Sequence, residues 1–187
     1  MDLILRLWLG LRSRLDARVL RARGARLDGH VWLRAVDVPR NAWDLRLAAG
    51  VALDRGVALI ATGARGDQPR ITIGARSYLN RYAIIDAAQS IVIGADCLLG
   101  PHCYLTDHDH ELRAAGRKSG LVAAPTRLAD GVWLGAHVSV LKGVTIGAGS
   151  VIGAGSVVSR DIPPRALALG APAKVVKSLD DSADADG

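Results

Sequence analysis

A six-residue repeat runs through the chain and is most regular between Leu128 and Pro163. Divided into sixes, this stretch reads LADGVW, LGAHVS, VLKGVT, IGAGSV, IGAGSV and VSRDIP. The first position is always Leu, Val or Ile, the second is Gly in three of the six hexads, and the fifth is Val or Ser in all but the last. Neither a helix, with about 3.6 residues per turn, nor a strand, which alternates every two residues, produces a period of six. A coil with three flat sides does, because each hexad supplies one short strand and one corner.

This pattern predicts an all-β prism of stacked coils. The aliphatic first position and the small fifth position should point inward, and the small second position should suit a tight corner. The repeat continues upstream with interruptions, in hexads at 27–38, 47–64, 73–90 and 93–110. Counting by eighteens gives about six coils, as expected for repeats that cannot bury their apolar faces alone and must stack.

The places where the repeat begins, breaks and ends predict the organisation of this 187-residue chain, which should form one domain. Residues 1–26 do not follow the repeat, and residues 27–164 should form the prism. The largest break, at 111–127, is polar and basic with Gly and Pro as breakers, and we expect a protruding loop there. Residues 165–187 should form a C-terminal segment that ends in a solvated acidic tail.

Residues 1–26 carry apolar side chains at roughly helical spacing, with seven arginines against two aspartates. This predicts a basic amphipathic helix. One interpretation is a cap over the open end of the prism, which otherwise exposes strand edges. The other is peripheral contact with an anionic membrane surface. We favour the cap, because an open end needs cover whatever the protein binds.

The composition narrows the remaining choices. The two cysteines, Cys97 and Cys103, occupy position five of adjacent hexads, which predicts buried structural thiols rather than a disulfide or a metal pair. The net charge of +6 suits anionic ligands, but no motif or aromatic platform for nucleic acid is visible. No apolar stretch reaches about 18 residues and no signal-peptide pattern opens the chain, so we expect a cytoplasmic protein.

Histidines mark the candidate chemistry. His108 and His110 lie in YLTDHDHELR, just before the long break. A histidine at a corner, under a loop that excludes water, is suited to act as a general base, although a corner histidine bonded to backbone would look the same. His102 and His137 occupy position four of hexads one coil apart and should stack on one face. They could form a metal pair, a ligand contact or a surface stripe, and the stripe is the simplest interpretation.

Four further motifs carry a family resemblance: YLN at Tyr78–Asn80, GVWLGAH at Gly131–His137, VIGAGSVVSRDIPP at Val151–Pro164 and GAPAKVVK at Gly170–Lys177. Together with TDHDHELR they resemble the hexapeptide-repeat acyltransferases, and most of all the sugar O-acetyltransferases of the maltose, galactoside and surface-polysaccharide kinds. The resemblance implies a left-handed parallel β-helix, a homotrimer with active sites between neighbouring prisms, and acetyl-CoA as co-substrate with no metal.

The resemblance also implies roles for individual residues. His108 matches the general base that removes a proton from a sugar hydroxyl, which then attacks the thioester of acetyl-CoA. Asn80 and, with a one-residue gap, Asp86 match positions that contact the acceptor. The positions that match contacts with CoA are Trp133, Ala136, Ala154, Ser159, Arg160, Lys174 and Lys177.

One departure bears on the acceptor. Only Asp109 separates His108 from the HELR stretch, where the sugar acetyltransferases have extra residues, so the acceptor need not be maltose or a galactoside. Two alternatives stay open at this point. One is a zinc-dependent hydro-lyase similar to the γ-class carbonic anhydrases, which the spacing of His108 and His110 does not favour. The other is a non-catalytic β-helix scaffold.

Overall fold

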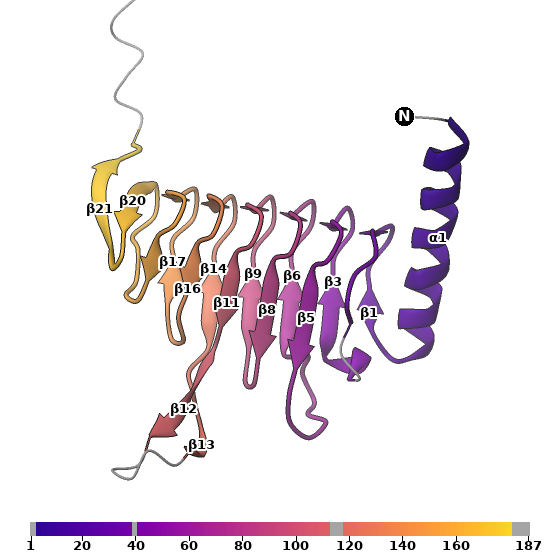
Figure 1. The fold of residues 1–187 in the computed structure, drawn as a ribbon, viewed down its shortest axis with the longest axis horizontal. Helices are drawn as coiled ribbons and strands as arrows, with labels where there is room; N and C mark the ends of the chain where they lie inside the picture. The colour runs from indigo at the N-terminus through magenta and orange to yellow at the C-terminus, as the bar shows by residue number, and fades with distance from the viewer. Residues whose placement is uncertain (1–2, 39–40, 113–117, 181–187) are drawn as a thin grey trace, which may run out of the picture.

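The chain folds into a left-handed parallel β-helix, a three-sided prism of stacked coils with one helix at its N-terminal end (Figure 1). The computed structural model describes residues 3–38, 41–112 and 118–180. The predicted acidic tail, 181–187, lies outside the described residues, apart from Asp180 just before it.

Three sheets form the sides of the prism, and each of the five coils from β3 to β19 contributes one strand to each sheet. Sheet A contains β1 (Arg26–Leu27), β3 (Leu45–Leu47), β6 (Ile71–Ile73), β9 (Ile91–Ile93), β14 (Thr126–Leu128) and β17 (Thr145–Ile146). Sheet B contains β2 (Trp32–Leu33), β4 (Ala52–Leu53), β7 (Tyr78–Leu79), β10 (Leu98–Leu99), β15 (Trp133–Leu134), β18 (Val151–Ile152), β20 (Ala166–Gly170) and β21 (Ala173–Ser178). Sheet C contains β5 (Ala58–Ala61), β8 (Ile84–Ala87), β11 (Tyr104–Thr106), β16 (Ser139–Val140) and β19 (Val157–Val158). All neighbouring strands in these sheets are parallel except β20 and β21, which form an antiparallel hairpin at the C-terminal end.

Three elements lie outside the coils: α1 (Leu3–Ala22), a short 3-10 helix, η1 (Ala42–Asp44), and the antiparallel hairpin of β12 (His108–Leu112) and β13 (Lys118–Ala123). The hairpin projects from the prism in the region where a loop over 111–127 was expected (Figure 1). It begins at His108, before that range, and residues 126 and 127 already belong to β14.

The core follows the repeat. In the hexads from Leu128 onward, every first position is fully buried, and the fifth positions are buried as well. The aliphatic first positions and the Val and Ser side chains of the fifth positions fill a narrow interior. Dense packing leaves no room there for large aromatic rings. The predicted inward positions are therefore confirmed.

The tight corner falls on position four of the hexad, which corrects the expectation that the small second position serves it. The backbone is left-handed at position four, with φ of +57° at His137 and +69° at Gly131. The second position is small for a different reason, which is the close approach of the next coil. A Cβ on Gly100 would lie 2.7 Å from the backbone nitrogen of Ala136, and one on Gly135 would lie 2.6 Å from that of Ala154.

Helix α1 covers the first coil, and a buried serine connects the two. The hydroxyl of Ser13 accepts a hydrogen bond from the Leu33 amide (2.9 Å) and lies 3.4 Å from the carbonyl oxygen of Val31, to which it donates. Ala17 and Leu20 are buried on the same side of the helix. Ser13 thereby satisfies backbone groups at the open edge of sheet B, which would otherwise have no strand beside them. Within the part of the chain that the structure describes, no helix is long and apolar enough to span a bilayer.

The two cysteines are free and fully buried, as the repeat predicted. Burial raises the pKa of the Cys103 thiol to about 11, and it also raises the pKa of Cys97. Both thiols therefore stay protonated and act as small apolar side chains of the core.

The close stacking of coils makes a testable prediction at Gly100. Replacing Gly100 by Ala places a methyl group against the backbone of the next coil, and we expect the free energy of unfolding to fall by about 1–3 kcal/mol. Gly10→Ala is the matched control, because a Cβ there meets only the Trp32 ring at 3.8 Å and alanine favours a helix. Urea unfolding of both variants measures the difference, and equal stability would contradict this account of position two.

Candidate active site

The candidate site centres on a buried carboxylate and a histidine that are adjacent in the chain. His108 is the first residue of β12, where the chain leaves the prism, and its side chain is 12% exposed. Its Nδ1 lies 3.0 Å from Oδ1 of Asp107, whose side chain is fully buried. The hydroxyl of Thr106 lies 3.4 Å from the same nitrogen and donates to the His108 carbonyl oxygen (3.1 Å).

Asp107 is held by the backbone of the preceding coil. Its two carboxylate oxygens accept hydrogen bonds from the amides of Ala88 (2.8 Å), Gln89 (2.8 Å) and Ser90 (2.5 Å) at the corner between β8 and β9. An ionised carboxylate can only accept, so the proton shared with His108 belongs on Nδ1 of the histidine. In the neutral imidazole with its proton on Nδ1, Nε2 carries the lone pair that can take a proton.

The acceptor candidates lie on the coil before His108. Asp86 is on β8 directly beside Thr106, and its carboxylate accepts a hydrogen bond from the Tyr104 hydroxyl at 3.4 Å. Burial is the main reason that the pKa of Tyr104 is raised, and the Asp86 carboxylate adds to it, so this hydroxyl remains a donor. Asn80 follows β7 at the corner from sheet B to sheet C, where its Oδ1 accepts from the Arg81 amide (2.7 Å). The structure thus places Asp86 beside Thr106, two residues before His108, whereas Asn80 lies at a different corner.

The candidate CoA residues surround the C-terminal third of the prism from different sides. Trp133 projects from the outer face of sheet B and is 53% exposed. Ala136 and Ala154 stack one coil apart at the corner from sheet B to sheet C, where the Gly155 amide donates to the Ala136 carbonyl oxygen (2.8 Å). The remaining four are exposed, two after β19 and two on β21: Ser159, Arg160, Lys174 and Lys177.

The predicted histidine stack is confirmed and is larger than the sequence suggested. The rings of His102 and His137 are parallel, with centroids 4.8 Å apart. Tyr82 stacks on the other face of His102 at 5.1 Å, so three rings follow one corner of the prism. Each residue has a left-handed φ, which turns its ring outward along the column. Among the residues that the structure describes, no group of three His, Cys, Asp or Glu side chains is placed to hold a metal ion.

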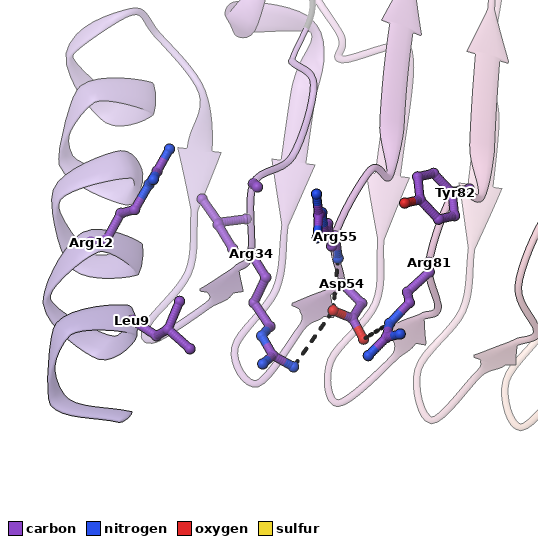
Figure 2. A pocket seen from close by; sticks show the side chains of 9 residues that line it. Leu9, Arg12, Arg34, Asp54, Arg55, Arg81 and Tyr82 are labelled. Carbon is purple, nitrogen blue, oxygen red and sulfur yellow. Dashed lines mark hydrogen bonds and ion pairs between the residues drawn. The ribbon is translucent and has the colours of Figure 1, made fainter. Parts of the chain in front are cut away.

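A second polar region lies between α1 and the first coils, next to the Tyr78–Asn80 motif (Figure 2). Four arginines line this pocket of about 280 Å³, with Leu9 of α1 at its edge: Arg12, Arg34, Arg55 and Arg81. Asp54 is its carboxylate, at 3.5 Å from Arg34 and 3.7 Å from Arg81. Burial opposes ionisation of Asp54, but the Arg55 amide, the Tyr78 hydroxyl and the two guanidinium groups keep its pKa below the usual value. The pocket therefore carries an excess of positive charge.

Comparison with known proteins tests the resemblance. Residues 125–160 match the family model of the bacterial transferase hexapeptide repeat. Galactoside O-acetyltransferase of Escherichia coli is 38% identical over 112 residues, which cover 59% of this chain and 55% of that protein. The predicted resemblance to the hexapeptide-repeat acyltransferases is confirmed.

Solved structures of hexapeptide-repeat proteins agree with this result. An acetyltransferase of Vibrio cholerae in complex with acetyl-CoA has a TM-score of 0.63 and 27% identity, over 90% of this chain and 79% of that one. A maltose O-acetyltransferase of Clostridium difficile has a TM-score of 0.60 and 28% identity, over 88% of this chain and 75% of that one. The chain spans about half the length, or less, of the curated relatives it matches, from 39% to 55% for three of them.

Asp107 is the residue that sequence reasoning missed. Its signal was present in the TDH motif, directly before His108. In a hexad repeat a polar residue at that point looks like another corner residue, and only the fold brings the amides of 88–90 around it.

The Asp107–His108 pair predicts how substitutions at each residue change turnover. His108→Ala should lower kcat by about 10²–10⁴-fold with an unchanged fold, because it removes the proposed base. Asp107→Asn should also lower kcat and alter the pH–rate profile, because an amide can donate to Nδ1 and move the imidazole proton to Nε2. His110→Ala is the matched control, since His110 is exposed on the outer part of β12. Near-normal turnover of His108→Ala in a thioester-cleavage assay would remove His108 from the mechanism.

Proposed function

We propose that this protein is an acetyl-CoA-dependent O-acetyltransferase that acts on a hydroxyl of a sugar or of a polysaccharide precursor. The observation that carries the proposal is the Asp107–His108 pair at the base of the hairpin, together with the hexapeptide-repeat likeness of the chain. Relatives named as acetyltransferases, one of them solved with acetyl-CoA, support the choice of co-substrate.

The proposed reaction uses His108 as the base and Asp107 as a positioning residue. Nε2 of His108 takes the proton of the acceptor hydroxyl as its oxygen attacks the thioester carbonyl carbon of acetyl-CoA. The tetrahedral intermediate then collapses, the C–S bond breaks, and the imidazolium returns a proton to the departing thiolate. The Asp107 carboxylate, 3.0 Å from Nδ1, stabilises the imidazolium in between. No covalent acyl-enzyme is required, because the two substrates react directly.

The proposed binding of CoA divides its contacts by chemistry. Arg160, Lys174 and Lys177 are exposed, which suits charge-assisted hydrogen bonds to the phosphates. The side chains of Ala136 and Ala154 are small, so the pantetheine arm would have room to lie along this corner of the prism, beside Ser159. Trp133 offers an exposed ring on the neighbouring face.

The proposed acceptor contacts are Asn80 and Asp86. A carboxylate and an amide together bind several hydroxyl groups, which is what a sugar presents. Lys142 of the next coil pairs with Asp109 on β12 at 2.5 Å, which holds the base of the β12–β13 hairpin against the prism beside His108. The hairpin would therefore cover the acceptor. The short connection between His108 and the HELR stretch favours an acceptor other than maltose or a galactoside.

We also propose a homotrimer with active sites between prisms. Asn80 follows a strand of sheet B, whereas His108 follows a strand of sheet C, so these two residues of one chain lie at different corners and cannot both contact one acceptor. A column on the outer face of sheet B runs from Trp32 through Ala52 and Tyr78 to Leu98 and Trp133. Its three large exposed members, Trp32, Leu98 and Trp133, are 44–53% exposed. Such a column is the kind of surface that a neighbouring prism would cover. The cytoplasmic location stays a prediction.

The proposed role of Arg160 is testable. Arg160→Ala should raise the KM for acetyl-CoA by roughly 10–100-fold and leave the acceptor KM nearly unchanged, because a hydrogen bond to a charged phosphate contributes about 1.5–3 kcal/mol. Arg127→Ala is a control that removes an exposed arginine from the outer face of sheet A. Comparing CoA with dephospho-CoA as inhibitors identifies the phosphate, and equal weakening of both by Arg160→Ala would exclude a contact with the 3′-phosphate.

A further inference from the structure

Helix α1 exposes its large apolar side chains to solvent and packs smaller ones on the prism. Ser13 and Ala17 are buried on the inner face, together with Leu20. Six apolar residues of the outer face, each at least 50% exposed, recur along the helix at spacings that place them on one side. They are Ile4, Leu7, Trp8, Leu11, Leu15 and Val19. A helix that served only to cover the prism would have the reverse arrangement.

The outer face of α1 is also the end surface of the molecule. The helix lies across the stack of coils at its N-terminal end, and the β20–β21 hairpin lies at the other end (Figure 1). Its outer side therefore faces away from the coils and from the β12–β13 hairpin. A flat surface could meet this end along the full length of α1 without contacting the rest of the prism.

Arginines lie on both sides of the apolar face. Helix α1 contains five arginines and one aspartate, an excess of four positive charges. Arg12 and Arg23 line a groove between α1 and the first coil on one side, and Arg14, Arg18 and Arg21 line a hollow on the other. Arg12 also lines the four-arginine pocket of Figure 2, which extends the positive charge onto the prism.

We propose that the outer face of α1 docks on a bilayer surface that contains anionic phospholipids. An apolar face with Leu and Trp, bordered by arginines, is the composition of helices that lie in the plane of a membrane interface. The apolar side chains enter the acyl boundary, while the long arginine side chains reach the phosphate groups beside the helix. The cap and the membrane contact use opposite faces of the helix, so α1 performs both.

Charge favours a bilayer over a second copy of this chain as the occupant. In a symmetric contact between two copies, each outer face would meet an identical face, and the arginines on its two sides would be brought together. Anionic headgroups instead neutralise these arginines. Docking at this end would leave His108 and the C-terminal cations free for their substrates, and would suit an acceptor presented at a membrane.

Vesicle binding by the intact protein tests the proposal. At 0.15 M salt the protein should co-sediment with vesicles of phosphatidylcholine and phosphatidylglycerol (3:1). It should bind vesicles of pure phosphatidylcholine at least about tenfold more weakly, because each arginine near an anionic surface contributes about fivefold to the affinity. Lipids brominated on their acyl chains should quench the fluorescence of Trp8, and Trp8→Phe should remove this quenching. This measurement needs no destabilising change.

Paired variants separate the apolar and charged contributions. Leu11→Ser with Leu15→Ser should weaken vesicle binding about tenfold or more with an unchanged melting temperature, because both side chains are exposed. Leu121→Ser with Val122→Ser is the matched control, because it makes the same kind of change at two exposed positions of β13, and it should leave vesicle binding unchanged. Arg14→Gln with Arg18→Gln should reduce the dependence on anionic lipid by roughly fivefold per arginine.

Two results would overturn the proposal. One is the absence of vesicle binding by the intact protein at 0.15 M salt. The other is a change in oligomeric state of the Leu11→Ser, Leu15→Ser protein in analytical ultracentrifugation, which would identify the outer face as a contact between copies. Either result would leave the acetyltransferase proposal untouched, since that depends on thioester cleavage in the absence of lipid.

Discussion

Parallel stacking of each coil on the previous one is the interaction on which this structure depends. Every coil hydrogen-bonds to its neighbours through short parallel strands, such as β7, β10 and β15 in sheet B. Strand neighbours lie only about 4.8 Å apart, so each position of the hexad meets its counterpart in the next coil. The second position must be small where the backbones approach, and the fourth must accept a left-handed φ. Because each hexad forms one side and one corner of the coil, both constraints recur every six residues.

The candidate catalytic residues lie where this regularity is interrupted. At His108 the chain leaves the prism for the β12–β13 hairpin and returns at β14. The chain leaves the prism at the corner that stacks on residues 88–90, and there the carboxylate of Asp107 accepts the hydrogen bonds of their amides. The same carboxylate orients His108. One carboxylate therefore both satisfies the amides of this corner and orients the histidine that we propose as the general base.

The two ends of the stack solve the problem of unpaired edges differently. At the C-terminal end, β21 turns back antiparallel on β20 and presents Lys174 and Lys177 at the surface. At the N-terminal end, Ser13 of α1 bonds to the backbone beside β2. Because only the inner side of the helix is needed for this cap, its outer side is free to carry another function, and it carries leucines, a tryptophan and arginines.

The sequence by itself determined the prism, its inward-facing positions, the stacked pair His102 and His137, the buried cysteines and the acyltransferase resemblance. A local repeat suffices for these, because in a stack of equal coils the position within a hexad decides what a side chain meets. The sequence did not reveal Asp107 as the partner of His108, the four-arginine pocket, or which side of α1 faces the prism. These depend on contacts between residues of different elements, such as Asp107 with the amides of 88–90 and Ser13 with Leu33, which are 17 to 20 positions apart. A periodic pattern describes each residue's own coil, and only the folded chain shows what an irregular segment places beside it.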